Sequence, residues 1–141
     1  MRLLFLIGKA LHGGLYRLTG GRVGGRLAGM PVLLLTTTGR RSGKRRRVPL
    51  TYFEDGDAFV VVGSKGGAPR HPGWYLNLVA MPEVEAQVGR VHRRLRARRA
   101  TPEEAARLWP VIVACWPGYA RYQAKTSREI PLVLLEPASQ A

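Results

Sequence analysis

The chain has 141 residues, of which 45% are hydrophobic, so it can bury the core of one domain but is too short for two domains of ordinary size. Its formal net charge of +14 favours anionic partners and predicts association that weakens as salt is added. The single cysteine, Cys115, excludes an internal disulfide, and the three histidines lack the spacing of a metal site, so we expect no metal and a reducing, cytoplasmic compartment.

Residues 1–31 are predicted to form an amphipathic helix and a glycine-rich connection. The apolar residues of this helix recur at helical spacing: Leu4, Ile7, Leu11, Leu15 and Leu18. Lys9 interrupts the first apolar run, which argues against a signal peptide, and no segment reaches the roughly 18 apolar residues of a spanning helix. Two interpretations stay open: the helix packs on the domain, or residues 1–20 lie on an anionic membrane surface.

A run of three strands is predicted next. Residues 32–38 (VLLLTTT) form a strand that is expected to be buried on both faces, residues 39–44 (GRRSGK) a turn, and residues 46–55 (RRVPLTYFED) the returning strand. The dipeptide Asp55-Gly56 predicts a hairpin into a third strand at residues 57–63.

The second half of the chain alternates helices with strands. Pro72 is expected to open a short helix that ends before Pro82, and residues 83–101 read as two strands around Gly89-Arg90. Thr101 is the predicted cap of a helix that runs to Cys115, and the last strand covers residues 130–137. Hairpins joined to helices in this order predict an α+β domain whose antiparallel strands close into a small barrel.

The basic turn at residues 39–47 is the first candidate binding site. It fails as a Walker loop, because only three residues separate Gly39 from Gly43 and Arg45 follows Lys44. Alternation along a strand would place Arg46 on the face of Val48, with Arg45 and Arg47 on the other face. A hairpin mouth of this kind suits a bounded ligand with several phosphates or carboxylates, although a solvated turn or a nucleic-acid patch stays open.

The second candidate site is residues 62–78 (VGSKGGAPRHPGWYLNL). Ser64 and Lys65 follow a strand, two glycines allow backbone N–H groups to approach a ligand, and the next helix offers its N-terminus to an anion. No carboxylate pair or Ser-His pair stands out, and Cys115 is expected to be a buried, inert thiol. The sequence therefore predicts a scaffold around a reactive cofactor.

With these segments in view, the chain resembles the deazaflavin-dependent nitroreductases of actinobacteria, a family that includes F420H2-dependent quinone reductases. The resemblance rests on residues 33–67, on the segment HPGWYLNLVAMPEV and on residues 109–137. It implies an FMN-binding split-barrel-like fold with flanking helices, and a reductase that transfers a hydride from reduced coenzyme F420 to a quinone, a nitroaromatic or a similar electron-poor substrate. The phosphate and the oligoglutamate tail of this deazaflavin would be the bounded polyanion.

The resemblance also implies the site residues. The cofactor contacts would be Arg40, Arg41, Ser42, Arg46, Pro49, Leu50, Gly63, Ser64, Lys65, Trp74, Tyr75 and Asn77. Tyr119, with Tyr122 beside it, would lie near the ring and the substrate as proton donor or substrate orienter. Thr51, Gly73 and Trp116 depart from the pattern of the nitro-reducing members and would shape the substrate pocket.

The resemblance divides the chain into the N-terminal segment 1–31, an F420-binding domain at 32–137 and a tail at 138–141. Two alternatives to the enzyme remain: a non-catalytic cofactor or lipid carrier on the same barrel, and a basic nucleic-acid-binding domain. The second is disfavoured, because Tyr52, Trp74 and Tyr119 lie apart from the basic run, where they could not stack on bases next to it. We expect a cytoplasmic protein, peripheral on the inner face of the membrane if residues 1–20 bind lipid, and its oligomeric state stays open.

Overall fold

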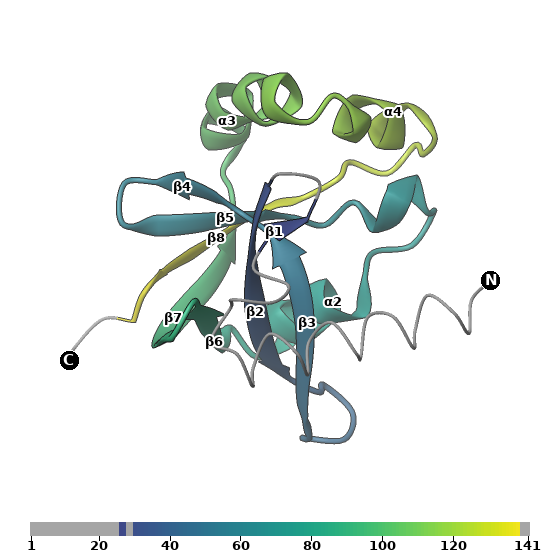
Figure 1. Cartoon of the computed structure of the whole chain (residues 1–141). Helices are drawn as coiled ribbons and strands as arrows, with labels where there is room; N and C mark the ends of the chain where they lie inside the picture. The colour runs from purple at the N-terminus through teal and green to yellow at the C-terminus, as the bar shows by residue number, and fades with distance from the viewer. Residues whose placement is uncertain (1–25, 28–29, 139–141) are drawn as a thin grey trace.

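The computed structural model describes residues 26–27 and 30–138 (Figure 1). The predicted N-terminal helix and most of the expected tail lie outside the described residues. The elements, in chain order, are β1 (Arg26–Leu27), β2 (Met30–Thr38), β3 (Arg45–Thr51), β4 (Phe53–Asp55), β5 (Ala58–Val62), the 3-10 turn η1 (Lys65–Gly67), α2 (Gly73–Ala80), β6 (Glu83–Val88), β7 (Val91–Arg99), α3 (Pro102–Cys115), α4 (Gly118–Ala124) and β8 (Leu132–Pro137).

All pairs of neighbouring strands in the described chain are antiparallel. The sheet runs β1-β2-β6-β7-β8-β5-β4, and β3 pairs with the other side of β2. The hairpins β2–β3, β4–β5 and β6–β7 are those that the sequence predicts, so the α+β class with an antiparallel sheet is confirmed. Helices α3 and α4 lie together at one end of the molecule, and α2 lies near the other (Figure 1).

The strand predicted at residues 46–55 is wrong as a single element. It is two strands, β3 and β4, that part at Tyr52. Strand β3 pairs with β2, whereas β4 pairs with β5, and the Tyr52 N–H donates to the Pro31 carbonyl at 3.2 Å. The chain therefore changes its pairing partner at Tyr52, from β2 to β5.

Two apolar cores explain why β5 is buried along its whole length. Phe59 and Val61 point into the barrel, whose core also holds Leu33, Leu35, Trp74 and Leu78. Ala58, Val60 and Val62 point to the opposite face, where Leu108 and Ile112 of α3 cover them. Because side chains of a strand alternate between faces, a strand between two cores has no polar positions.

Helix α3 begins where the sequence predicts. The Thr101 hydroxyl accepts a hydrogen bond from the Glu104 N–H at 3.2 Å, and the Glu104 carboxylate accepts one from the Thr101 N–H at 2.9 Å, which is a complete capping box. The expectation that Cys115 is buried is wrong, because its side chain is exposed. Leu108 and Ile112 are the buried residues of α3, and Val113 and Trp116 pack against the same core, but Cys115, the last residue of the helix, is exposed between them.

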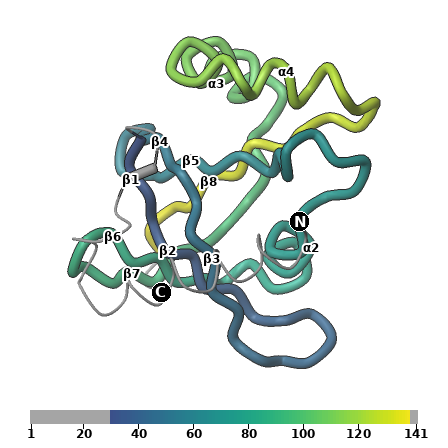
Figure 2. Tube along the Cα trace, turned by 45° about the vertical axis from the view of Figure 1, so that its right-hand side comes forward, coloured from purple at the N-terminus to yellow at the C-terminus, as the bar shows by residue number. Residues whose placement is uncertain are grey.

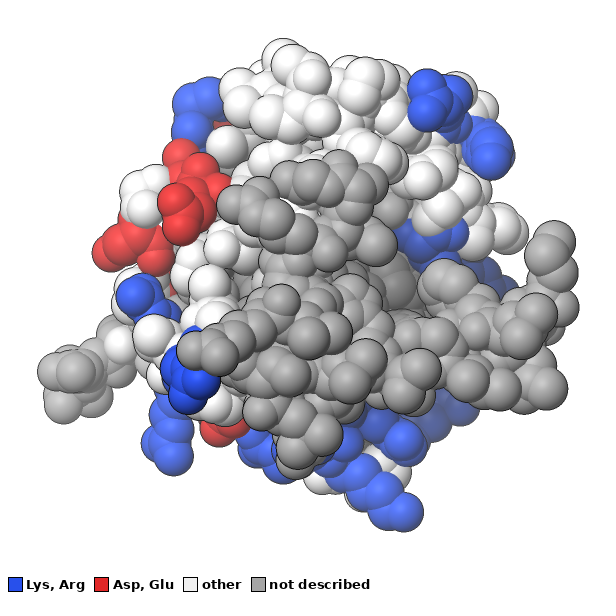
Figure 3. All heavy atoms as spheres, viewed as in Figure 1, with Lys and Arg blue, Asp and Glu red and all other residues white. Residues whose placement is uncertain are grey.

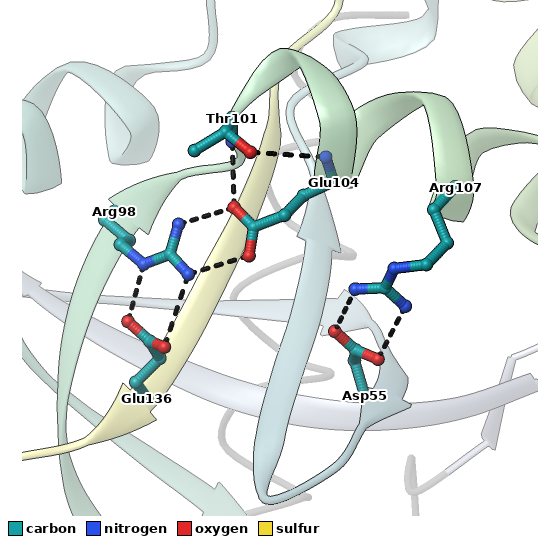
Figure 4. A network of polar contacts seen from close by, with 6 residues as sticks. All are labelled: Asp55, Arg98, Thr101, Glu104, Arg107 and Glu136. Carbon is teal, nitrogen blue, oxygen red and sulfur yellow. Dashed lines mark hydrogen bonds and ion pairs between the residues drawn. The ribbon is translucent and has the colours of Figure 1, made fainter.

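Two arginines fix α3 to the barrel (Figure 4). Arg98 of β7 binds Glu104 through two nitrogens at 2.6 and 2.8 Å, and also binds Glu136 of β8 at 2.7 Å. Arg107 of α3 binds both carboxylate oxygens of Asp55, at 3.0 and 2.9 Å. Bidentate pairs of this kind fix orientation as well as distance, so they hold α3, and with it the start of α4, over the sheet.

Candidate functional site

The predicted site segments lie along one side of the molecule. The β2–β3 hairpin, α2, the loop with η1, and α4 follow one another there in both views (Figures 1 and 2). Figure 3 shows Lys and Arg along the lower edge of the face seen in Figure 1, where the β2–β3 hairpin projects, and Asp and Glu at the left, near β4 and β5. The side where the site was predicted thus carries Lys and Arg, which also appear at the upper and lower left of this face.

Arg40 is held in place by α2. Its N–H and its Nη1 donate to the Asn77 side-chain oxygen at 3.2 and 2.8 Å, and Nη1 lies 3.5 Å from the Gly73 carbonyl. Asn77 is buried, and its amide nitrogen donates to the Thr37 hydroxyl at 3.2 Å. The geometry therefore makes Asn77 a bridge from strand β2 to Arg40, whose side chain remains exposed.

The turn after Arg40 closes on itself. The Gly39 N–H donates to the Lys44 carbonyl at 2.7 Å, and the Ser42 hydroxyl accepts from the Lys44 N–H at 3.1 Å. These bonds occupy the backbone of the turn and leave the side chains of Arg41 and Lys44 exposed. The turn is thus a fixed loop that presents cations to solvent.

The predicted alternation along β3 is confirmed by the strand register. Arg46 pairs with the buried Thr37, and Val48 with Leu35, so both lie on the core side of β3, Val48 buried and Arg46 exposed near the turn, whereas Arg45 and Arg47 lie on the other side. Arg45 forms an ion pair with Glu85 at 2.6 Å.

Pro49 and Leu50 must point to opposite faces of β3, because they are consecutive residues of one strand. Leu50 pairs with Leu33 and packs against the barrel core, on the face of Arg46, while Pro49 pairs with Leu34 on the other face. A ligand on the Arg46 face would therefore meet Pro49 through its backbone only.

The loop at Gly63–Gly67 has an unusual backbone. Lys65 has φ 45°, and Gly66 and Gly67 have φ 63° and 82°, so three successive residues are left-handed. Lysine adopts this conformation rarely, and such conformations collect at functional sites. The Gly67 N–H donates to the Ser64 carbonyl at 2.9 Å, which closes the turn and leaves Lys65 exposed and Ser64 half-buried.

Gly67 packs directly against α4. A Cβ atom at this position would lie 2.6 Å from the Tyr122 carbonyl oxygen, closer than any real contact. Helix α4 therefore fixes the loop that carries Ser64 and Lys65, and Tyr122, a predicted site residue, supplies the backbone atom that it meets.

Arg128 is a residue of this site that the sequence did not indicate. Its guanidinium donates to the carbonyls of Gly63, Ser64 and Ala68 at 3.1, 2.7 and 2.8 Å. It also lies 3.1 Å from His71 Nδ1, which must accept because arginine has donors only. Burial, and next the charge of Arg128, lower the pKa of His71 below its ordinary 6.5. No motif or spacing marks Arg128, since its acceptors are backbone atoms distant in the sequence.

Trp74 and Tyr75 are mainly core residues. Both are buried in the barrel core, and the Tyr75 ring lies 4.7 Å from the ring of His71. The His71 contact joins the loop of Ser64 to α2.

Tyr119 and Tyr122 lie side by side on α4, with ring centroids 5.9 Å apart. The Tyr119 hydroxyl is 2.8 Å from the Thr51 hydroxyl at the end of β3. Burial raises the pKa of Tyr119 above its ordinary value of 10.0, although the Thr51 hydrogen bond acts in the opposite direction. Tyr119 is thus a protonated phenol at neutral pH, held at a defined position.

Contacts among the described residues connect all these segments. Thr51 of β3 contacts Tyr119 of α4, and Tyr122 of the same helix contacts Gly67. Ser64, in the loop of Gly67, contacts Arg128, which contacts His71 beside α2. Asn77 of α2 contacts Arg40. One series of contacts therefore joins segments that are distant in the sequence. Among residues 26–27 and 30–138, no group of His, Cys, Asp and Glu side chains could hold a metal ion. None of the helices described is long and apolar enough to cross a membrane.

A family model described as F420H(2)-dependent quinone reductase matches residues 10–137 of the chain. An F420H(2)-dependent quinone reductase of Mycobacterium tuberculosis strain H37Rv is 46% identical over 129 residues, which cover 89% of this chain and 87% of the relative. A second protein of that strain, named a putative F420H(2)-dependent quinone reductase, is 39% identical over 108 residues, which cover 77% of this chain and 91% of the relative.

Solved structures agree with these matches. An F420-H2 dependent reductase is 44% identical, with a TM-score of 0.69, over 75% of this chain and 94% of that chain. A Listeria innocua protein assigned as a pyridoxamine 5′-phosphate oxidase is 15% identical, with a TM-score of 0.56, over 77% of this chain and 84% of that chain. The second likeness concerns the fold alone, and it identifies the barrel as a split barrel.

Proposed function

The chain belongs to the F420H(2)-dependent quinone reductase family, and on this premise we propose that it transfers a hydride from reduced coenzyme F420 to a quinone or a similar electron-poor compound. Its cofactor is coenzyme F420, and it is an oxidoreductase on a split barrel. Nitroaromatic compounds are further candidate substrates.

The observation that carries the proposal is the connected set of contacts between the left-handed Ser64–Gly67 loop, the anchored Arg40 and the buried Tyr119. Coenzyme F420 has a phosphate, an oligoglutamate tail and a deazaflavin ring, so its site needs both cations and an apolar surface. Arg40, Arg41, Lys65 and Arg46 supply exposed cations, and the half-buried Leu50 and buried Trp74 supply apolar surface. The residues present therefore fit the cofactor.

We assign the cofactor contacts by side-chain chemistry. The basic hairpin residues and Lys65 bind phosphate and carboxylates, as charge-assisted donors do. The hydroxyls of Ser42 and Ser64 add neutral donors, and Gly63, whose N–H donates to the Pro131 carbonyl, contributes by its place at the base of the loop. Pro49 and Leu50 would support the ring, Pro49 through its backbone. Asn77, with its amide engaged by Arg40 and Thr37, contributes by holding Arg40. Trp74 and Tyr75, which are buried in the barrel core, would contact the ring through the small part of each side chain that is exposed.

The bound deazaflavin would supply the hydride. The chain would position the substrate, exclude water from the site and supply a proton. Tyr119 is the proposed proton donor or substrate orienter, because its hydroxyl is buried, protonated at neutral pH and held by Thr51. Tyr122 packs against the Tyr119 ring and is proposed to line the same pocket. Thr51 and Trp116 would limit the shape of the substrate.

The proposed domain organisation is a cofactor-binding domain at residues 32–137 behind the N-terminal segment 1–31. For residues 1–20 we propose contact with the inner face of the cytoplasmic membrane, where lipid-soluble quinones dissolve. Sedimentation with anionic and neutral vesicles would test this, because a basic amphipathic helix binds only the anionic ones strongly. Sedimentation with neither kind contradicts the membrane contact, and equal sedimentation with both contradicts a contact that depends on anionic lipid.

A single assay tests the enzyme. The purified protein is titrated with F420H2, menadione is added, and the return of the visible absorption of oxidised F420 is followed. Binding and turnover are expected. Binding without turnover would favour a carrier on the same barrel, and the absence of binding would refute the cofactor assignment.

A further inference from the structure

We propose that Arg128 is a positioning residue that holds the Ser64–Gly67 loop in its binding conformation and couples it to helix α4. The proposal rests on the proposed function, because the loop matters as part of the cofactor site. Arg128 itself is not assigned a contact with the cofactor.

The guanidinium of Arg128 spans the base of the loop. It binds the carbonyls of Gly63 and Ser64 at 3.1 and 2.7 Å, before the left-handed residues begin. It also binds the carbonyl of Ala68 at 2.8 Å, immediately after they end. One planar group with donors in fixed directions thus fixes both ends of the turn, which a flexible ammonium cannot reproduce.

The loop needs an external restraint because its backbone is strained. Lys65 has φ 45°, a conformation that most side chains avoid. The turn itself contributes the bonds from Gly67 N–H to the Ser64 carbonyl, at 2.9 Å, and from Ala68 N–H to the Lys65 carbonyl, at 3.1 Å. Arg128 supplies the additional bonds that make this conformation the favoured one.

Arg128 is itself fixed to α4. The Gln123 side chain donates to the Arg128 carbonyl at 2.7 Å and accepts from the Ile130 N–H at 2.9 Å. Gln123 follows Tyr122, whose carbonyl meets Gly67. The helix that carries Tyr119 and the loop that carries Lys65 are therefore joined by two contacts, one through Arg128 and one through Gly67.

Arg128 also carries a positive charge, and the effect of this charge on cofactor binding differs from the effect of Arg128 on the loop conformation. Within the described residues, its guanidinium contacts carbonyl oxygens and Nδ1 of His71, and no carboxylate. It therefore adds positive charge below Ser64 and Lys65. The test must distinguish the loss of this charge from the loss of loop geometry.

Three variants make that distinction: Arg128→Met removes charge and geometry, Arg128→Lys keeps the charge, and Gln123→Met loosens the anchor alone. Arg90→Met, in the exposed turn between β6 and β7, is the control for net charge. With F420H2 and menadione, Arg128→Met should raise KM for the cofactor at least tenfold and change kcat less than about threefold. Arg128→Lys should recover only a small part of this loss, and Gln123→Met should shift KM in the same direction by less.

Amide hydrogen exchange gives a readout that needs no cofactor. Exchange in residues 64–71 should accelerate at least tenfold in Arg128→Met and Arg128→Lys, while exchange in β6 and β7 stays within about twofold of the wild type. If wild-type protein binds no F420, the proposed function fails but exchange still decides on Arg128. Unchanged exchange in this loop, equal acceleration everywhere, or full recovery of KM by Arg128→Lys would overturn the positioning role.

Discussion

The hydroxyls of Thr51 and Tyr119 lie 2.8 Å apart, although 68 residues separate them in the chain. Thr51 is the last residue of β3, directly before the chain leaves β2 for β5, and Tyr119 is near the start of α4. The hydrogen bond thus joins the strand of Arg46 to the helix of the candidate proton donor. A buried phenol with a polar partner has a defined orientation, which a catalytic hydroxyl requires.

Removing the Tyr119 hydroxyl should impair turnover more than cofactor binding. We expect Tyr119→Phe to lower kcat by about 100–10,000-fold, the usual range for the loss of a general acid, with the F420 dissociation constant changed less than about threefold. Steady-state kinetics with menadione and fluorescence titration with F420 measure the two quantities.

Thr51→Val is the matched variant for this prediction, because it keeps the shape of the side chain and removes its hydroxyl. A double-mutant cycle with Tyr119→Phe should give a coupling free energy of about 1 kcal/mol for stability. If Tyr119→Phe retains wild-type kcat, the hydroxyl has no role in the chemistry.

Reversing the charge of Lys65 or Arg46 should weaken F420 binding. A loss of about tenfold or more is expected for Lys65→Glu and Arg46→Glu at low salt, and the remaining affinity should depend less on salt, because fewer cations face the phosphate and the tail. Titrations at several salt concentrations measure both effects.

Arg96→Glu is the control for that experiment, since Arg96 lies on β7 between Glu83 of β6 and Glu136 of β8 and is none of the proposed cofactor contacts. It changes the net charge equally and should leave F420 affinity within about threefold. A loss as large as that of the site variants would mean that the overall charge, not the hairpin and the loop, attracts the cofactor.

Gly67 and Gly66 offer a test of the packing between the loop and α4. Both have positive φ, 82° and 63°, but a Cβ at Gly67 would lie 2.6 Å from the Tyr122 carbonyl, whereas none lies within 4 Å at Gly66. Gly66→Ala should therefore reduce the free energy of unfolding by about 1 kcal/mol, from backbone strain alone. Gly67→Ala should reduce it by about 2–4 kcal/mol and also weaken F420 binding. Chemical denaturation and F420 titration compare the two, and equal effects would contradict the predicted contact.

Acid should destabilise the fold through Glu104. Its hydrogen bonds to Arg98, and next to the Thr101 N–H, lower the pKa of Glu104 from 4.5 to about 2. Because the folded pKa is lower than the unfolded one, its stabilisation is complete above about pH 5 and is lost as the pH falls towards 2. Over this range the wild type should lose about 1–2 kcal/mol more than Glu104→Gln, allowing for partial solvent screening.

Urea denaturation at a series of pH values measures this difference. Glutamine keeps the capping box, so the comparison isolates the charge. Glu103→Gln, at an exposed neighbouring position, is the control and should follow the wild-type curve. Parallel curves for the wild type and Glu104→Gln would show that the Arg98 network does not contribute through ionisation.

Local patterns predicted most of the secondary structure because they depend on neighbours in the sequence. The Thr101 cap, the Asp55-Gly56 hairpin and the face of Arg46 all follow from backbone preferences or from alternation, and all are confirmed. The break at Tyr52 was missed, because a change of pairing partner depends on which strands are near. The exposure of Cys115 was missed for a related reason, since it depends on how the end of α3 lies on the core.

The sequence by itself determined the family, the α+β split barrel and the anionic character of the ligand, since motifs, alternation and charge are properties of the chain order. Only the tertiary structure decided how the site is held together. Thr51 meets Tyr119, Gly67 meets Tyr122, and Arg128 binds three carbonyls of a distant loop. The physical reason is that these partners are backbone atoms and single hydroxyls. Any residue presents a carbonyl, so no residue type or spacing marks the contact until the chain has folded.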